Sequence, residues 1–184
     1  TVIHFTDSAG FGGAERALLH LLAGLDRQEW RPVLFHHDEP GIAPLLAEAR
    51  SLDVPLWVVP RMTTLRDISR LWQFVSAIRE QRPAVFHAHL TWQLACKYGL
   101  LAANLAHVPA VVATQHLCPP LDDRYILRIQ PRIIALGVDR YLAVSQGIAQ
   151  QLYQEFRIPQ HQVRVVYNGI PLDSNDHGTR FGRR

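Results

Sequence analysis

Short apolar runs alternate with amphipathic stretches of helical length along almost the whole chain. The apolar runs are mostly continuous, which is typical of strands buried on both faces of a parallel sheet. They cover residues 2–6, 32–36, 55–59, 84–88, 110–114, 140–144 and 163–167. The helical stretches between them cover residues 14–25, 42–52, 65–81, 92–106, 123–136 and 146–156. Because such βαβ units cross over with a right hand, we predict an α/β fold: a Rossmann-like three-layer α/β/α sandwich with a mainly parallel, roughly seven-stranded sheet.

Two of the helical stretches have apolar faces that indicate which side should pack on the sheet. In 14–25 this predicted face consists of Ala17, Leu18, Leu21, Leu22 and Leu25. In 65–81 it consists of Leu65, Ile68, Leu71, Trp72, Val75 and Ile78.

The composition is that of a globular domain, with 184 residues of which 48% are hydrophobic and 19% charged. We assign 1–173 to one domain and the polar segment 174–184 to a tail or the start of an interdomain linker. No stretch has the ~18 uninterrupted apolar residues of a membrane span, and no secretory leader is evident, so we expect a cytoplasmic protein. The formal net charge is +3, and the basic residues are scattered rather than clustered beside aromatic ones, which disfavours nucleic-acid binding.

A glycine-rich segment, Asp7-Ser8-Ala9-Gly10-Phe11-Gly12-Gly13, joins the first strand to its helix. Glycines before a helix N-terminus let backbone N–H groups approach an anion, and the helix dipole favours negative charge there. The spacing is neither the G-x-G-x-x-G of dinucleotide-binding domains nor a P-loop. Gly12 and Gly13 are therefore candidates for phosphate binding, with an ordinary turn that holds no ligand as the alternative.

The fourth strand runs into His87-Ala88-His89. Alternate residues of a strand point to the same side, so both imidazoles can line a cleft as hydrogen-bonding or acid/base groups. Alternatively, one histidine packs in the core and the other faces solvent. A metal site would need a further ligand, for which His116 is the obvious candidate. We expect no metal ion here.

Polar groups also follow the last three strands, at the edge where open α/β sheets bind ligands. Thr114-Gln115-His116 ends the fifth strand, Ser145-Gln146 follows the sixth, and Tyr167-Asn168-Gly169 ends the seventh. Ser145 could equally cap the helix after it. Neither a nucleophile triad nor a carboxylate pair is apparent, so the sequence predicts a polar edge suited to anions and sugars.

The segment 123–136 raises the question of a membrane surface. Arg124, Arg128 and Arg132 share one helical face beside several apolar residues. Basic and apolar faces together can lie on an anionic membrane, so peripheral membrane contact is one interpretation. A solvated face above a core-packed one is the other, and Pro131 is expected to split the helix.

Five of these segments, taken in order, resemble motifs of the family 4 retaining glycosyltransferases, which have the GT-B fold of two Rossmann-like domains. Gly12-Gly13-Ala14-Glu15 before a leucine-rich helix is similar to the N-terminal motif of that family, and VFHAH at 85–89 is similar to its DVVHAH segment. VATQH at 112–116 resembles VVTTHH, LAVSQ at 142–146 resembles IAVSE, and VVYNGI at 165–170 resembles VIPNGVD. The ordered set spans Val2 to about Asp173.

The resemblance implies a role for each matched residue. Gly12 and Gly13 would lie against the donor phosphates or the leaving group. His89 would be the catalytic residue, bonding sugar hydroxyls near the reacting carbon. For the acceptor side it implies His87, His116 and Ser145, and for the hinge Asn168 and Gly169. A nucleotide-sugar would be a substrate, and neither a cofactor nor a metal ion is implied.

Some residues depart from the family pattern. Gln146 stands where Glu is frequent, Tyr167 where Pro is frequent, and Pro171 where Asp usually follows. The C-terminal domain of this family holds most of the nucleotide through basic residues and a Glu-x7-Glu motif, and no segment after Asn168 is long enough to form it. We therefore expect an N-terminal, acceptor-binding domain that works with an absent C-terminal domain and is inactive alone.

The implied activity is transfer of a sugar from a nucleotide-sugar to a glycan, a lipid-linked saccharide or a small-molecule acceptor. A GT-B sugar-nucleotide epimerase is one alternative, which an acid/base carboxylate in the cleft would favour. The other is a non-enzymatic α/β binding module for anionic glycans.

Overall fold

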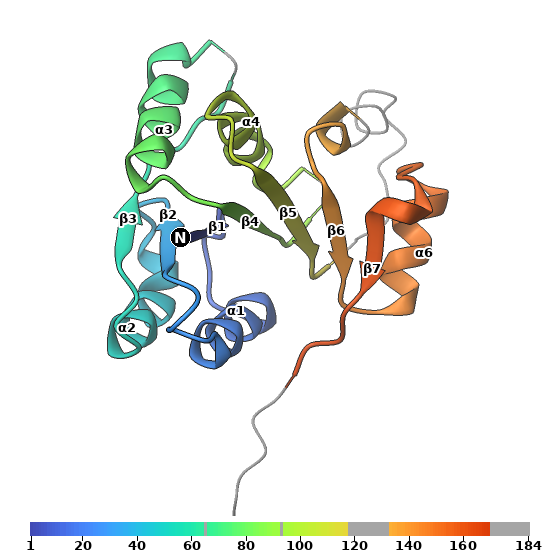
Figure 1. Cartoon of the computed structure of the whole chain (residues 1–184), viewed down its shortest axis with the longest axis horizontal. Helices are drawn as coiled ribbons and strands as arrows, with labels where there is room; N and C mark the ends of the chain where they lie inside the picture. The colour runs from blue at the N-terminus through green and yellow to red at the C-terminus, as the bar shows by residue number, and fades with distance from the viewer. Residues whose placement is uncertain (65, 93, 118–132, 170–184) are drawn as a thin grey trace, which may run out of the picture.

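Seven strands form one parallel sheet in the order β3-β2-β1-β4-β5-β6-β7 (Figure 1). The computed structural model describes residues 1–64, 66–92, 94–117 and 133–169. The strands are β1 (Val2–Thr6), β2 (Pro32–His36), β3 (Leu56–Val58), β4 (Val85–Leu90), β5 (Ala110–Gln115), β6 (Arg140–Ala143) and β7 (Val163–Val165). The prediction of a largely parallel sheet of about seven strands is confirmed.

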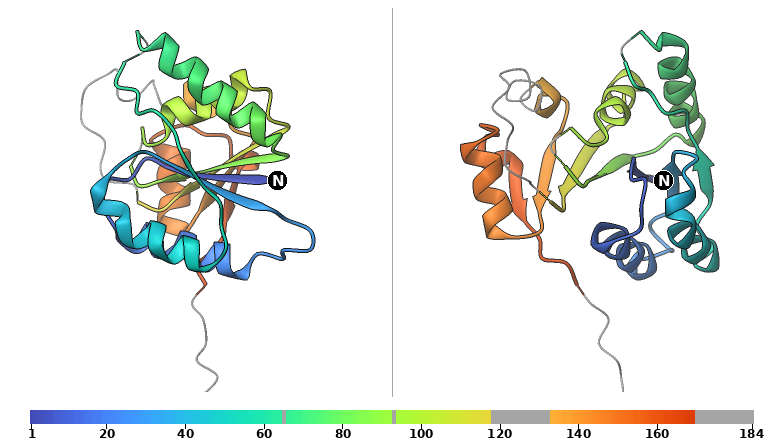
Figure 2. Two further views of the ribbon diagram at one scale, coloured as in Figure 1. Left: turned by 90° about the vertical axis from the view of Figure 1, so that its left-hand side faces the viewer. Right: turned by 180° about the vertical axis from the view of Figure 1, so that it is seen from behind.

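The helices form the two outer layers of the predicted sandwich. They are α1 (Gly13–Gly24), α2 (Ala43–Ser51), α3 (Ile68–Gln81), α4 (Lys97–Leu105) and α6 (Gln146–Gln154), with short 3-10 turns η1 (Pro40–Ile42) and η2 (Gln160–Gln162). Figure 2 shows α1 and α2 on one face of the sheet and α3 and α4 on the other. The buried residues of α6 belong to the same apolar core as those of α3 and α4, so α6 covers that second face.

Alternation along the strands divides the interior into two cores. Ile3 and Phe5 of β1 enter the larger core, beneath α3, α4 and α6. The smaller core holds Leu18 and Leu22 of α1 with Leu34 of β2. The alternate residues of β1 and β4 are polar, so the centre of the sheet presents histidine side chains instead of a third apolar cluster.

One predicted helix boundary is wrong by several residues. The segment predicted as helix 92–106 becomes helical only at Lys97, where α4 begins. Cys96 has a left-handed backbone, with φ of 58°, and its N–H donates to Oδ2 of Asp7 at 2.7 Å. This tertiary hydrogen bond holds 94–96 as a turn against the end of β1. Most of the predicted helix 123–136 lies outside the described residues. The structure describes its last four residues, and 133–135 are helical.

The predicted apolar faces are also partly corrected. In α1 the buried leucines include Leu19, whereas Leu21 is 37% exposed. In α3 Phe74 is buried, whereas Ile68 and Trp72 are more than half exposed. Helical spacing alone does not determine how a helix is rotated against a sheet. A leucine at the edge of the apolar face can line a surface groove instead of packing in the core.

Candidate functional site

Four histidines from three neighbouring elements meet at the middle of the sheet. In the parallel register His4 of β1 lies beside His87 of β4, and His89 lies beside Thr114 of β5. His116 follows β5 directly, and all four imidazoles are less than a tenth exposed. The sequence produces this cluster because side chains alternate between the two faces of a strand. In the register of β1 with β4, His4, His87 and His89 all fall on the face that α1 covers.

The rings are joined by hydrogen bonds. Nδ1 of His4 lies 3.2 Å from Nε2 of His89, and Nδ1 of His89 lies 3.3 Å from Nε2 of His116. Nε2 of His87 lies 2.7 Å from the Thr114 hydroxyl. Both ring nitrogens of His89 are thus engaged by other histidines, so a direct contact between His89 and a substrate hydroxyl requires one of these bonds to be exchanged.

Burial sets the protonation of the cluster. Removal from water lowers the pKa of His87 to about 4, and the charged form of nearby His116 adds to that effect. The pKa values of His4 and His89 also fall well below the usual histidine value, chiefly through burial. Burial likewise lowers the pKa of His116, against the opposing influence of Glu15. The four imidazoles are therefore neutral at pH 7.

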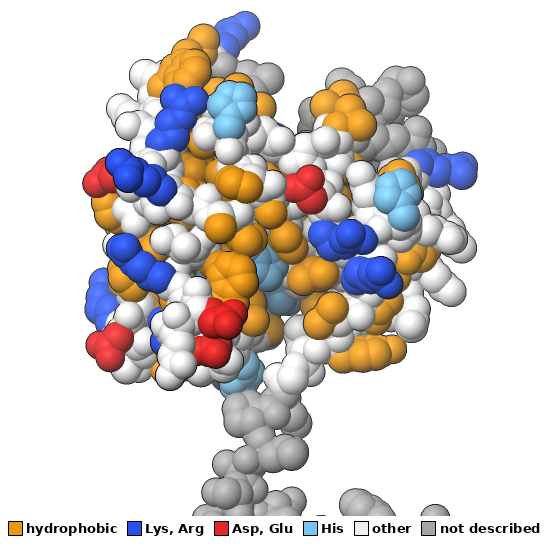
Figure 3. All heavy atoms as spheres, in the orientation of Figure 1, with side chains coloured by type: hydrophobic (Ala, Val, Ile, Leu, Met, Phe, Trp, Pro, Cys, Tyr) orange, Lys and Arg blue, Asp and Glu red, His pale blue; other side chains and the backbone are white. Residues whose placement is uncertain are grey.

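A groove of about 610 Å³ runs between α1 and the end of β7, with the histidines in its wall. We call this the histidine groove. It is lined by Ala17, His20, Leu21, Ala23, Gly24, His87, His89, Thr114, His116, Leu142, Val166, Tyr167, Asn168 and Gly169. In the space-filling view, histidine side chains are visible in a furrow between the α1 side and the β6–β7 side of the molecule (Figure 3). Five of the residues singled out from the sequence thus line one groove: His87, His89, His116, Asn168 and Gly169.

The other three singled-out residues do not line this groove. The N–H of Gly12 donates to Oε2 of Glu15 at 2.8 Å. One of the N–H groups predicted to bind phosphate is therefore already hydrogen-bonded to a side chain of this protein. Gly13 has no heavy atom near the position a Cβ would take, so space for a ligand remains there. Ser145 caps α6, accepting the N–H of Ile148 at 3.2 Å.

The model of Glycosyltransferase Family 4 matches residues 11–174, which is most of the chain. The chain belongs to this family. No curated protein sequence matches it significantly.

Solved structures with the same fold include HepE, a glycosyltransferase and an epimerase. HepE from Anabaena, in complex with UDP, has a TM-score of 0.73 at 16% identity over 92% of this chain and 44% of its own. A glycosyltransferase from Rickettsia africae has a TM-score of 0.74 at 14% identity, over 92% and 43%. UDP-GlcNAc 2-epimerase from Neisseria meningitidis, bound to UDP-GlcNAc, has a TM-score of 0.61 at 15% identity, over 91% and 46%. The family 4 chain therefore spans less than half the length of each of these proteins and has the fold of one Rossmann-like domain.

A metal ion would have three histidines to bind in this family 4 domain. Nitrogen atoms of His4, His87 and His89 all lie within 4.8 Å of one another. The group contains no carboxylate to offset the charge of a buried cation. In addition, Nδ1 of His4 and Nε2 of His89 are already hydrogen-bonded to each other. Coordination of a metal ion by all three residues would therefore require the hydrogen bond between His4 and His89 to be exchanged.

Two features of the site had no place in the sequence prediction. His4 lies in a strand that reads as plain core, and only the register with β4 brings it to the histidines. A second hollow, of about 270 Å³, lies on the other side of β1 near the strand ends, with Asp7, His37, Arg61 and Trp92 among its lining residues. His37 follows β2 and Arg61 follows β3. Both could have been identified from the sequence, because they lie just after the ends of predicted strands.

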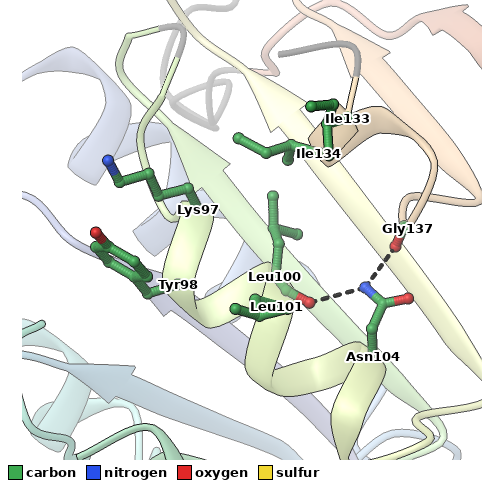
Figure 4. A pocket seen from close by; sticks show the side chains of 8 residues that line it. All are labelled: Lys97, Tyr98, Leu100, Leu101, Asn104, Ile133, Ile134 and Gly137. Carbon is green, nitrogen blue, oxygen red and sulfur yellow. Dashed lines mark hydrogen bonds between the residues drawn. The ribbon is translucent and has the colours of Figure 1, made fainter. Parts of the chain in front are cut away.

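An apolar hollow of about 440 Å³ lies on α4, on the face away from the histidines. Leu100, Leu101 and Asn104 of α4 form one side, and Ile133, Ile134 and Gly137 form the other (Figure 4). The Asn104 amide ties the two sides together by donating to the carbonyls of Leu100 and Gly137, each at 2.8 Å. This hollow has few polar groups to orient a sugar.

Proposed function

We propose that this chain is the N-terminal, acceptor-binding domain of a retaining, metal-independent glycosyltransferase. Together with a C-terminal nucleotide-binding domain it would transfer a sugar from a nucleotide-sugar to a glycan, a lipid-linked saccharide or a small-molecule acceptor. Alone it would be inactive, because that second domain holds most of the nucleotide.

The observation that carries the proposal is the histidine groove. It joins neutral imidazoles and the Thr114 hydroxyl to an apolar wall that includes Leu21 and Val166. A sugar presents hydroxyls at its edge and C–H groups on its faces, and a groove of this mixed character suits both. The membership of the chain in family 4 supports the same function.

In the proposed reaction the acceptor hydroxyl attacks the anomeric carbon on the face from which the nucleoside diphosphate departs. The new bond joins acceptor oxygen to carbon, the carbon–phosphate oxygen bond breaks, and the acceptor proton passes to the leaving phosphate. Gly12, Gly13 and His89 would stabilise the charge that develops on the donor side, while His87, His116 and Ser145 would face the acceptor. Asn168 and Gly169 would lead the chain into the hinge.

Neutral histidines fit this chemistry. The transition state of glycosyl transfer carries positive charge on the sugar, as in glycoside hydrolysis, so a protonated imidazole beside it would be repulsive. Burial keeps His87 neutral, with a pKa of about 4, and a neutral ring can still donate one hydrogen bond.

The epimerase alternative is less well supported. An epimerase would need an acid/base carboxylate in the cleft, and the described residues that line the histidine groove include none. The binding-module alternative predicts glycan binding without turnover. Incubating the complete protein with nucleotide-sugar alone, and then with acceptor, separates the three: an epimerised donor, a glycosylated acceptor or neither.

The membrane interpretation concerns a segment that the structure does not describe. Arg124, Arg128 and Arg132 all lie outside the described residues. Among the residues that are described, no helix combines the length and the apolar character needed to cross a bilayer. We propose a cytoplasmic enzyme, with 123–136 as the segment that would contact the inner face of the membrane.

The decisive experiment uses the complete protein that carries this chain. Product formation from a panel of nucleotide-sugars and acceptors is followed by ¹H NMR of the new anomeric proton. We expect an anomeric configuration equal to that of the donor, a large loss of rate in His89→Ala and His116→Ala, and no loss in a control change at exposed His161. A wild-type rate in His89→Ala would show that the catalytic assignment is wrong, and the absence of a second Rossmann-like domain would exclude the transferase proposal.

A further inference from the structure

Two hollows of the surface meet at one pair of residues. The apolar hollow on α4 and the hollow of about 270 Å³ near the end of β1 are both lined by Lys97 and Tyr98, at the start of α4. We call the second one the strand-end hollow. Neither shares a lining residue with the histidine groove. The two hollows therefore form a separate feature of the surface, in which an apolar part adjoins a polar part.

The walls of the apolar hollow are accessible to solvent. Leu101 of α4 and Ile134 on the opposite wall are half-buried, and Ile133 is 61% exposed. Apolar surface left in water in this way is typical of an interaction site, and covering it is favourable. A hydrocarbon chain is the group that such walls accommodate best.

A cation stands at one end of the apolar hollow. In Figure 4, Lys97 and Tyr98 lie at one end and Asn104 lies at the other. Nζ of Lys97 lies 4.9 Å from the centre of the Tyr98 ring, and the Tyr98 hydroxyl donates to the carbonyl of Thr63 at 3.0 Å, which holds the ring in place. Lys97 is half-buried and forms no salt bridge with a described residue. Its charge can therefore serve an anionic group of a ligand, and a lysine ammonium binds phosphate as a point charge.

The strand-end hollow has a polar and aromatic lining. Trp92 is 44% exposed, and the Arg61 guanidinium is bonded to Glu39 at 2.9 Å and to the carbonyl of Asp7 at 3.2 Å. Because a guanidinium has five N–H groups, donors of Arg61 remain for a ligand. The Asp7 carboxylate also lines this hollow and would repel an anion placed within it. With a volume just below the ~300–1,000 Å³ of small-molecule sites, the hollow suits one uncharged sugar ring.

We propose that the two hollows bind a lipid-linked saccharide, with the hydrocarbon chain in the apolar hollow, a phosphate at Lys97 and the adjoining sugar in the strand-end hollow. Chain, phosphate and sugar follow one another in such a molecule as apolar walls, cation and polar hollow follow one another here. Of the three acceptor classes named above, this selects the lipid-linked one. The reacting sugar would be one further from the lipid, facing His87 and His116. That selection rests on the proposed function, whereas binding of a phosphate-bearing amphiphile does not.

Binding of hexyl, heptyl and octyl phosphate to the complete protein that carries this chain tests the site. The probes are used below the concentrations at which they form micelles, and ¹H–¹³C spectra of isoleucine and leucine methyl groups report where they bind. We expect the signals of Leu101, Ile133 and Ile134 to shift and those of Leu21, in the histidine groove, to stay in place. The affinity should rise about fourfold with each added methylene until the hollow is full, which is ~0.8 kcal/mol for each.

Single substitutions separate the cation from the apolar walls. Lys97→Met keeps the length of the side chain without its charge, and we expect about tenfold weaker binding of octyl phosphate with no change for octyl glucoside, which has no phosphate. Lys97→Arg should restore most of the loss. Leu101→Gln places an amide in the apolar wall and should weaken both probes about tenfold. Leu136→Gln is the matched control, at a leucine that is 87% exposed and does not line the hollow, and should change neither.

Three results would overturn the proposal. Methyl shifts that spread to Leu136, or an affinity that keeps rising with chain length without a plateau, would show contact with a lipid surface instead of one bound molecule. The absence of any shift at Leu101 and Ile134 in the complete protein would show that the hollow is closed to amphiphiles there. Equal binding of octyl phosphate to wild type and to Lys97→Met would show that the cation does not hold the phosphate.

The outcomes remain distinct from those of the transfer assay. A protein that binds octyl phosphate as expected but transfers no sugar would refute the proposed function and leave the amphiphile site intact. For an active transferase, we expect Lys97→Met to raise KM for a lipid-linked acceptor, with kcat unchanged and no effect on the same saccharide without its lipid phosphate. Equal KM values for both acceptors, unaffected by Lys97→Met, would refute the lipid-linked acceptor and leave the proposed function intact.

Discussion

The backbone N–H of Gly12 donates to Oε2 of Glu15 at 2.8 Å, so the loop after β1 is held by a buried carboxylate. Glu15 is the third residue of α1 and reaches back to the residue before the helix, as in one half of a capping box. Glycine has no side chain to supply the other half, which leaves Glu15 as the cap. This contact places a negative charge at the loop where a donor phosphate was predicted.

Replacing Glu15 should therefore destabilise the fold. We expect Glu15→Ala to lower the free energy of unfolding by about 1–2 kcal/mol, because the N–H of Gly12 loses its charged acceptor. Glu15→Gln keeps an acceptor oxygen and should lose less than half as much. Urea unfolding measures both, and equal stability of Glu15→Ala and wild type would contradict the capping role.

Acid should weaken the fold through the histidines. The pKa of His87 is lowered to about 4 in the folded chain, against about 6.5 when unfolded, so between these values the unfolded state binds more protons. Its contribution to stability is complete above pH 6.5 and is lost as the pH falls towards 4. The slope is at most about 1.4 kcal/mol per pH unit for each such histidine.

Urea unfolding at a series of pH values between 7.5 and 5 measures that slope. His87→Phe should reduce it, whereas replacement of exposed His161 should leave it unchanged. A free energy of unfolding that does not change over this range would mean that the cluster is not neutral and buried.

Ser145 should contribute to stability as a helix cap. Because its hydroxyl accepts the N–H of Ile148, Ser145→Ala should cost about 1 kcal/mol, and Ser145→Asp should restore most of that loss. The same variants in the transfer assay separate capping from acceptor binding. If Ser145→Asp recovers both stability and rate, the proposed acceptor contact of Ser145 is unnecessary.

Gly99 should not tolerate a methyl group. A Cβ at this position of α4 would overlap the ring of Phe5, whereas a Cβ at Gly147 of α6 would meet only the Ser145 hydroxyl, at 3.8 Å. We expect Gly99→Ala to lose about 1–3 kcal/mol through overpacking, and Gly147→Ala to be neutral or slightly stabilising. Thermal unfolding of the two variants compares them, and equal effects would contradict the close approach of α4 to β1.

The fold could be predicted because each strand is a short apolar run bounded by turn residues, and all seven appear where expected. Helix starts were less predictable, since the N-terminus of α4 depends on Asp7, which is 89 residues away from Cys96 along the chain. Likewise, spacing placed Leu21 in the core, although it lines the groove. Both differences come from tertiary contacts that local periodicity does not contain.

The candidate site was partly predictable for a related reason. His87, His89 and His116 occur at strand ends, where open sheets bind ligands, so position alone singled them out. His4 could not be identified, because its role depends on the pairing of β1 with β4 and not on its neighbours in sequence. Sequence also could not reveal that the N–H of Gly12 is taken by Glu15.

The most direct test of the histidine groove as the ligand site is a ¹H–¹⁵N titration of this chain with UDP, UDP-glucose and a panel of mono- and disaccharides. We predict that a bound sugar shifts the amide signals of Leu21, Thr114 and Asn168, which line the groove. The signals of Leu101 and Ile134, in the apolar hollow on α4, should stay in place. Shifts confined to the apolar hollow, or the absence of any shift across the panel, would show that the histidine groove is not the ligand site.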